Sequence, residues 1–112
     1  MSQKSLGKIE SINLGMGGYQ NAMFGLSVQL VYGGCMGCGD FKGTWGLEIK
    51  PDKNSKWTEF DRGIKFDETM RFINDLLIKA KKQNLQEMKG VPVEVTIEGG
   101  SLKSWRILEE VL

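Results

Sequence analysis

Eleven of the fifteen glycines in this 112-residue chain lie within its first 46 residues, where they gather in two clusters. The clusters read Gly15-Met-Gly-Gly-Tyr-Gln-Asn21 and Gly33-Gly-Cys-Met-Gly-Cys-Gly-Asp40. Glycine loses much backbone entropy on folding and has no side chain to pack, so a small domain uses it sparingly. Aromatic rings and short polar side chains stand among these glycines. The combination predicts tight turns and a surface at which the backbone approaches a ligand or partner.

The composition predicts a single folded domain over residues 1–112. Hydrophobic residues make up 40% of the chain and charged residues 26%, which is ordinary for a globular protein. A formal net charge of +1 argues against general nucleic-acid binding, which normally needs a clear basic excess. No window is apolar enough to span a membrane, and the first residues lack the apolar core of a secretion signal. We therefore expect a cytoplasmic protein.

Alternating apolar residues predict the strands. The first spans Lys8–Leu14, and a second runs from Phe24 to Tyr32, where every second residue is apolar. A third places Phe41, Trp45, Leu47 and Ile49 on one buried face, with Lys42, Thr44 and Glu48 opposite. Near the C-terminus, Val91–Ile97 and Leu102–Leu108 form a hairpin around Gly99-Gly100.

One helix is expected between the third and fourth strands. A polar loop over 51–65 precedes it, Asp67 caps its first turn, and it ends near Asn84. Its apolar stripe contains Phe66, Met70, Ile73, Leu76, Leu77 and Ala80. The pattern predicts an α+β domain with a mainly antiparallel sheet of about five strands and one amphipathic helix on one face.

Catalytic and metal chemistry are not expected. The chain has no histidine, the commonest general base and metal ligand. Cys35-Met-Gly-Cys38 has the spacing of a zinc or redox motif, but a structural zinc site needs four ligands, so two reduced cysteines in a turn fit better. The first glycine cluster leads into a strand, whereas a phosphate-binding loop leads into a helix. We predict no enzyme, no cofactor and no metal.

The candidate binding residues come from the two glycine clusters and the polar loop. Short connections would place Tyr19, Gln20, Asn21, Met36 and Asp40 at one end of the sheet. Trp45 is expected in the core, Trp105 in the core or over a strand edge, and Trp57 either in the site or pinning the loop. The predicted site residues are Gly17, Gly18, Tyr19, Gln20, Asn21, Met36, Asp40, Lys42, Lys56, Trp57 and Arg62.

Several segments resemble a family of small uncharacterised proteins encoded by phages and prophages. They are Gly-Gly-Tyr-Gln-Asn-Ala-Met-Phe-Gly-Leu-Ser (17–27), Gly-Asp-Phe-Lys-Gly-Thr-Trp (39–45) and Lys-Trp-Thr-Glu-Phe-Asp-Arg (56–62), with Leu-Lys-Ser-Trp-Arg-Ile-Leu-Glu-Glu-Val-Leu (102–112) at the end. The resemblance implies no activity. It implies a context, a phage-encoded accessory factor that acts on the host, with anti-defence as the leading class.

The resulting hypothesis is an anti-defence protein that works by binding. The favoured mode is sequestration of a small nucleotide-derived signal: Tyr19 or Trp57 would stack on a base, Gln20 and Asn21 would bind polar edges, and a cation among Lys42, Lys56 and Arg62 would meet phosphate. The pocket would lie at a homodimer or higher interface. The alternatives are an anti-CRISPR-like inhibitor that docks on a host nuclease or effector, and a virion-assembly or structural protein.

Overall fold

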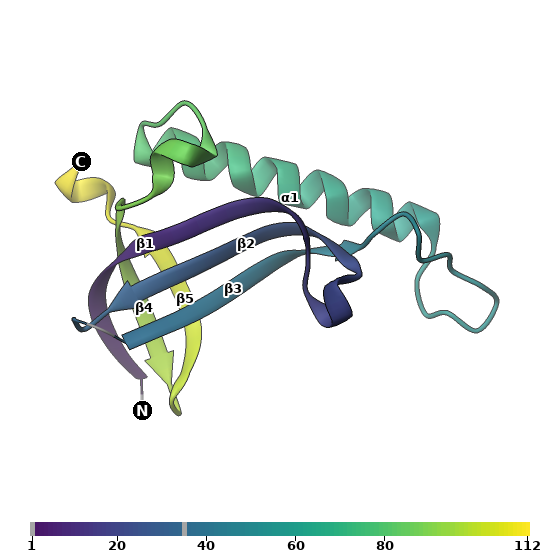
Figure 1. Ribbon diagram of the computed structural model, residues 1–112, viewed down its shortest axis with the longest axis horizontal. Coiled ribbons are helices and arrows are strands. Elements are labelled where there is room, and N and C mark those ends of the chain that lie inside the picture. Colours follow the sequence, from purple (N-terminus) through teal and green to yellow (C-terminus); the bar gives the residue numbers. More distant parts are fainter. Residues whose placement is uncertain (1, 35) are drawn as a thin grey trace.

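Five antiparallel strands form one curled sheet, and a single long helix crosses it (Figure 1). The computed structural model describes residues 2–34 and 36–112. The main elements are β1 (Ser2–Gly17), β2 (Met23–Tyr32), β3 (Met36–Trp45), α1 (Glu59–Ala80), β4 (Pro92–Glu98) and β5 (Ser101–Ile107). Three short 3-10 turns are η1 (Tyr19–Asn21), η2 (Leu85–Met88) and η3 (Glu109–Val111). The α+β prediction, with the helix between the third and fourth strands, is confirmed.

The curl of the sheet comes from β1, which is shared between two halves. Its first part, Ser2–Lys8, pairs with β4, and Gly7–Gly17 pairs with β2, with a register shift between Ile9 and Ser11. The strand order is therefore β3-β2-β1-β4-β5. A bulge increases local twist, so the two halves turn toward each other. The edge strands β3 and β5 approach across the opening, where Trp105 Nε1 donates a hydrogen bond of 2.8 Å to Asp40 Oδ2.

The core lies between the inner face of the sheet and α1. The predicted alternation in β2 and β4 is confirmed, because the apolar side chains at alternate positions are buried. The core cluster consists of Ile9, Leu26, Val28, Leu30, Ile73, Leu76, Ala80, Met88, Val91, Val93, Val95 and Ile107. Gly99 and Gly100 have φ of 61° and 81°, as the predicted two-residue turn between β4 and β5 requires.

The helix starts nine residues, or about two and a half turns, earlier than the sequence suggested. Thr58 is its N-cap: its side chain accepts from the Asp61 N–H, while the Asp61 carboxylate accepts from the Thr58 N–H. The predicted start near Asp67 is therefore wrong, and the preceding loop is shorter than 51–65. The helix ends at Ala80, before Lys81 at φ 59°, rather than near Asn84. Of the described helices, none combines the length and the apolar character that a membrane crossing needs.

The two faces of β3 are inverted relative to the prediction. Paired residues on antiparallel strands share a face, and the buried Leu26 and Val28 pair with Lys42 and Asp40. Lys42 and Asp40 therefore lie on the inner side with the helix. Phe41 and Trp45 lie on the other side, so the expectation that Trp45 belongs to the core is wrong. Aromatic rings in a strand usually mark its buried face, and this strand reverses that rule.

Candidate functional site

The two glycine-rich turns lie at opposite ends of the sheet, which corrects the expectation that they converge. Met23 pairs with Trp45 at one end of the β2–β3 hairpin, and Tyr32 pairs with Met36 at the other. Ten strand residues separate the two turns. Met36 is therefore remote from Tyr19, and Asp40 lies in the middle of β3. The β1–β2 turn brings together the largest group of predicted site residues, Gly17 to Asn21.

The β1–β2 turn is held in an uncommon backbone conformation. Gly18, Gln20 and Asn21 have positive φ of 67°, 51° and 58°. Two of the three carry a side chain, and non-glycine residues in this region cost of order 1–3 kcal/mol each. Backbone bonds close the turn, from Asn21 N to Gly18 O at 3.1 Å and from Ala22 N to Tyr19 O at 3.0 Å. Strain of this kind tends to persist where a loop has a binding role.

The turn presents an exposed aromatic ring next to a second one. Tyr19 is 65% exposed, and its ring meets that of Trp45 edge to face, with centroids 6.3 Å apart and planes at 89°. Gly17 is in contact with Phe41, since a Cβ built on Gly17 would lie 3.3 Å from the Phe41 ring. Three aromatic residues therefore gather at this end of the sheet, on the side away from α1.

That side of β1, β2 and β3, which we name the outer face, has almost no relief and almost no charge. The register places five residues of each strand on it: Lys8, Ser11, Asn13, Gly15 and Gly17 from β1; Met23, Gly25, Ser27, Gln29 and Val31 from β2; and Gly37, Gly39, Phe41, Gly43 and Trp45 from β3. Six of these residues are glycines, and Lys8 is the only charged one. The remaining side chains are uncharged and include two aromatic rings, those of Phe41 and Trp45. The outer face is therefore rich in glycine and carries one charge.

Two glycines of the outer face are dictated by the close approach of β2 and β3. A Cβ on Gly25 would lie 2.3 Å from Lys42 O, and one on Gly43 would lie 2.3 Å from Phe24 O. Both contacts are with backbone, which cannot move aside without separating the strands. These glycines are therefore required for the fold, whereas Gly15 and Gly37 have open space or ordinary contacts at the same position.

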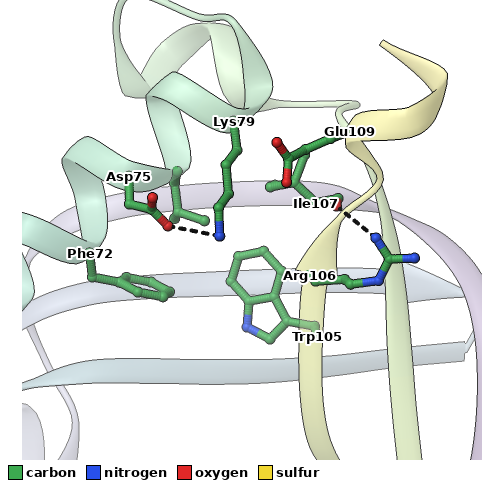
Figure 2. A pocket seen from close by; sticks show the side chains of 8 residues that line it. Phe72, Asp75, Lys79, Trp105, Arg106, Ile107 and Glu109 are labelled. Carbon is green, nitrogen blue, oxygen red and sulfur yellow. Dashed lines mark hydrogen bonds and ion pairs between the residues drawn. The ribbon is translucent and has the colours of Figure 1, made fainter.

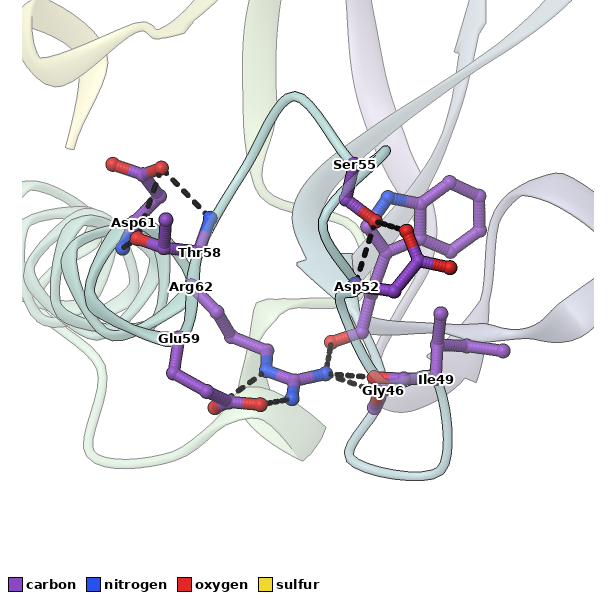
Figure 3. Close-up of polar contacts among 9 residues, drawn as sticks. Gly46, Ile49, Asp52, Ser55, Thr58, Glu59, Asp61 and Arg62 are labelled. Carbon is purple, nitrogen blue, oxygen red and sulfur yellow. Dashed lines mark hydrogen bonds and ion pairs between the residues drawn. The ribbon is translucent and has the colours of Figure 1, made fainter.

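Arg62 of α1 fixes the loop that follows β3 (Figure 3). Its Nη1 donates to Gly46 O at 2.6 Å and to Ile49 O at 2.8 Å, and it forms an ion pair with Glu59. The residue is 2% exposed, so its guanidinium is out of reach of a ligand. Trp57 covers it, with its ring centroid 5.0 Å from the guanidinium carbon.

This geometry reassigns several predicted site residues. Arg62 and Trp57 hold the loop in place, which is one of the two roles expected for Trp57. Lys42 lies over the Phe72 ring at 4.8 Å, and Asp40 accepts the Trp105 indole hydrogen bond, both on the inner side of the sheet. These four side chains have structural partners away from the outer face.

The loop itself adds positive charge at the same end of the molecule as η1 (Figure 1). Lys50, Lys53 and Lys56 are exposed, and none forms an ion pair within residues 2–34 and 36–112. The loop is ordered by Asp52, which accepts from Asn54 N at 2.8 Å and whose own N–H donates to Ser55 Oγ at 3.0 Å. Sequence reasoning selected Lys56 and overlooked the other two lysines.

Several concave regions lie on the helix side, and two of them are lined by aromatic rings. An open hollow of about 530 Å³ beside the β1–β2 turn is lined by Met16, Phe24, Gly46, Leu47, Glu48 and Phe66. A smaller pocket of about 140 Å³ lies between α1 and β5, with Phe72 and Trp105 as walls (Figure 2). Most of its charges are paired: Lys79 lies 3.0 Å from Asp75, and Arg106 bonds Glu94 and Glu110. That pocket has room for a few water molecules, so it offers no second ligand site.

Two further observations concern metal ligands and the cysteines. Within the described residues, no three His, Cys, Asp or Glu side chains gather as metal ligands would. Cys38 lies inside β3 rather than in a turn, and burial together with the nearby Asp40 raises the pKa of its thiol. A raised pKa disfavours the reactive thiolate. The predicted role of Cys35 lies outside the described residues.

Comparisons with protein-family models, with curated proteins and with solved structures give no significant match to this chain.

Proposed function

We propose that this protein is a non-catalytic binding protein that sequesters a small nucleotide-derived ligand at the Tyr19 end of the outer face. The observation that carries the proposal is the strained β1–β2 turn, which holds an exposed Tyr19 beside Trp45 at the end of a glycine-rich face with a single charged residue. A base would stack on the exposed Tyr19 ring, as bases do on aromatic platforms, with Trp45 supporting that ring edge to face. Gln20 and Asn21 offer amide groups to its polar edge.

Charge complementarity supports a ligand with phosphate at one end only. Lys50, Lys53 and Lys56 lie on the ordered loop at this end, and the outer face beyond is uncharged up to Lys8. A long phosphate backbone would need basic groups along its whole path. A mononucleotide or cyclic dinucleotide needs them only beside its rings. These lysines take the role that the sequence had suggested for Lys42 and Arg62.

The architecture provides a second, weaker support by analogy. The OB-fold is a partly open barrel of five strands that binds oligonucleotides and oligosaccharides on the face of its second and third strands and at the loop between its first two. The sheet here also has five strands, is open between β3 and β5, and places the outer face on β2 and β3. Because one fold hosts many functions, the analogy indicates a location and not a ligand.

The resemblance to small phage proteins supplies the biological context. A phage protein that binds a host signalling nucleotide would block the immune response that depends on it. Anti-defence by sequestration is therefore the proposed role, in the host cytoplasm.

Thermal melting with a panel of cyclic nucleotides and cyclic ADP-ribose isomers tests the proposal. A ligand at a hundred times its Kd stabilises a protein by about 2.7 kcal/mol, which is a measurable rise in Tm. Tyr19→Ala should abolish the rise without lowering the Tm of the free protein, because Tyr19 is largely exposed. Phe60→Ala removes a ring that is 77% exposed on α1 and should leave the rise unchanged. Absence of any shift across the panel would overturn the nucleotide proposal.

Co-purification from host lysate distinguishes the other class of function. A large stoichiometric host protein that stays bound, with no shift from any nucleotide, would favour an inhibitor that docks on a nuclease or effector. The same exposed rings would then form the centre of a protein interface.

A further inference from the structure

We infer that the second half of β1 is a self-association edge, at which two copies of this chain pair antiparallel around a two-fold axis. β1 has a strand on both sides only over Gly7 and Lys8, because β4 pairs with Ser2–Lys8 and β2 pairs from Gly7 onward. From Ser11 to Gly17 the side away from β2 has no strand partner. Its backbone N–H and C=O groups form a template for another strand.

This edge lacks the devices that normally prevent pairing. Proteins protect open edges with charged residues, proline, bulges or a covering segment. The stretch Ser11-Ile-Asn-Leu-Gly-Met-Gly17 has no charge and no proline, and the register shift lies before it. The short turn η2 lies beside its beginning, where Leu85 and Gln86 share a shallow hollow with Ile12, Asn13 and Leu14. Residues 15–17 extend past this cover.

The apolar hollow beside the edge indicates what the partner must supply. Met16 is 50% exposed and Leu47 is 63% exposed, and both line the hollow of about 530 Å³. Leu14, at 37% exposed, adds to the apolar surface along the same strand. A partner strand in register would place an apolar side chain over this hollow. The Met16 side chain of a second copy has that chemistry.

Symmetry favours a second copy as the occupant. An antiparallel edge is self-complementary under a two-fold axis, and two uncharged copies of residues 11–17 meet without like-charge repulsion. The edge strands β3 and β5 offer no equivalent stretch, because β3 carries Asp40 and Lys42 and β5 carries Lys103 and Arg106. The hydrogen bond from Trp105 to Asp40 also bridges these two strands. Pairing through β1 would extend the sheet across both copies and place the two outer faces on the same side of it.

Analytical ultracentrifugation over a wide concentration range tests the inference independently of any ligand. We expect a concentration-dependent species of about twice the 12.5 kDa chain mass. Met16→Lys puts a charge on the edge and should give the monomer at all concentrations, with a Tm close to that of the parent protein. Leu6→Lys adds the same charge at a residue that is 71% exposed in the first half of β1, beside β4, and should leave the association unchanged.

Hydrogen exchange locates the interface directly. Alternate backbone amides over 11–17 should exchange more slowly as protein concentration rises, and amides of β3 should not change. A parent protein that stays monomeric, or a dimer that Met16→Lys leaves intact, would overturn the inference. Slowed exchange confined to another surface would overturn it as well.

Discussion

Replacement of Arg62 tests whether the segment Lys56–Arg62 is a structural clamp or part of a binding site. In the clamp interpretation, Arg62→Ala removes the donors to Gly46 O and Ile49 O, at 2.6 and 2.8 Å. The loop after β3 then loses its attachment to α1. Because Arg62 is 2% exposed, water does not replace these bonds without rearrangement.

The magnitude follows from the two short bonds. A hydrogen bond to a charged group contributes about 1.5–3 kcal/mol, so two at the lower value give about 3 kcal/mol. The contact with Trp45 O, at 3.5 Å, adds nothing to this estimate. The ion pair with Glu59 adds less than about 1 kcal/mol, because the Glu59 side chain is 60% exposed. We expect a loss of about 3–4 kcal/mol from a free energy of unfolding of about 5–15 kcal/mol.

Urea denaturation followed by circular dichroism measures this loss, and Tm should fall by roughly 10–20 °C. Glu59→Gln is the matched control, since it removes the exposed half of the ion pair and leaves the carbonyl contacts. Its cost should stay under about 1 kcal/mol. The amide of Ile49, which donates to Gly46 O at 3.1 Å, should lose hydrogen-exchange protection in Arg62→Ala and keep it in Glu59→Gln.

Equal stability of the Arg62→Ala and Glu59→Gln proteins would refute the clamp. So would an Arg62→Ala protein that unfolds like the parent but no longer binds a ligand identified by thermal melting. In that case the guanidinium would contact the ligand, as the sequence first suggested.

Three further predictions concern the strands and the C-terminus. Gly43→Ala should destabilise the protein by about 3 kcal/mol, the upper end for overpacking, because its Cβ would meet a backbone oxygen at 2.3 Å. Gly63→Ala, in α1 with no atom within 4 Å of the new methyl group, should instead stabilise the protein by about 0.5–1 kcal/mol. If urea denaturation gave Gly43→Ala the small loss of stability that is usual for a surface variant, the close approach of β2 and β3 would be contradicted. Trp105→Phe keeps the ring packing but removes the hydrogen-bond donor to Asp40, so the free energy of unfolding should fall by about 1–2 kcal/mol in the same urea denaturation. An unchanged denaturation midpoint would mean that this hydrogen bond does not hold β3 near β5. Glu110 should titrate near pH 2 by carboxyl NMR, because the hydrogen bonds from the Arg106 guanidinium lower its pKa to about 2. Its contribution to stability is therefore full above its ordinary pKa of 4.5 and is lost as the pH falls toward 2. A titration midpoint near 4.5 would show that the contact between Arg106 and Glu110 is not formed in solution.

The order of elements was predictable because, in most of this chain, the residues that the local apolar pattern predicts to be buried do lie in the core. Val93 and Val95 alternate with polar residues and are buried, and Gly99-Gly100 forms the turn that its sequence favours. The start of α1 also had a local signal, because Thr58 and Asp61 have the spacing of a capping box, and the prediction overlooked it. The burial of Arg62 was not predictable in the same way. Arg62 is a charged residue in the most buried part of the first turns, and the carbonyls that satisfy it come from residues 13 and 16 positions earlier in the chain. No local pattern contains that contact.

The position of the glycine clusters was partly accessible from the sequence. A strand of ten residues between two turns separates them by roughly 30 Å at about 3.3 Å per residue, so the two clusters could not form one site. The faces of β3 were harder to assign. Phe41 and Trp45 are more apolar than Asp40 and Lys42, so the sequence favours the two aromatic residues for the buried face. In the structure Asp40 and Lys42 lie on the inner face, where their partners are Trp105 and the Phe72 ring, and these tertiary contacts are not visible in the local sequence.

The spacing of the glycines carries the signal that was missed. Gly15 and Gly17 are two residues apart, as are Gly37 and Gly39, and Gly43 continues the same alternate positions in β3. Glycine at every second residue of a strand leaves one face without side chains, whereas turn glycines cluster without a period. Six of the eleven early glycines therefore lie on the outer face. Among these six, the close approach of β2 and β3 requires glycine only at Gly25 and Gly43. The packing of the domain does not require glycine at positions 15 and 37. A flat ligand bound on the outer face would account for these two glycines, and neither turn accounts for them.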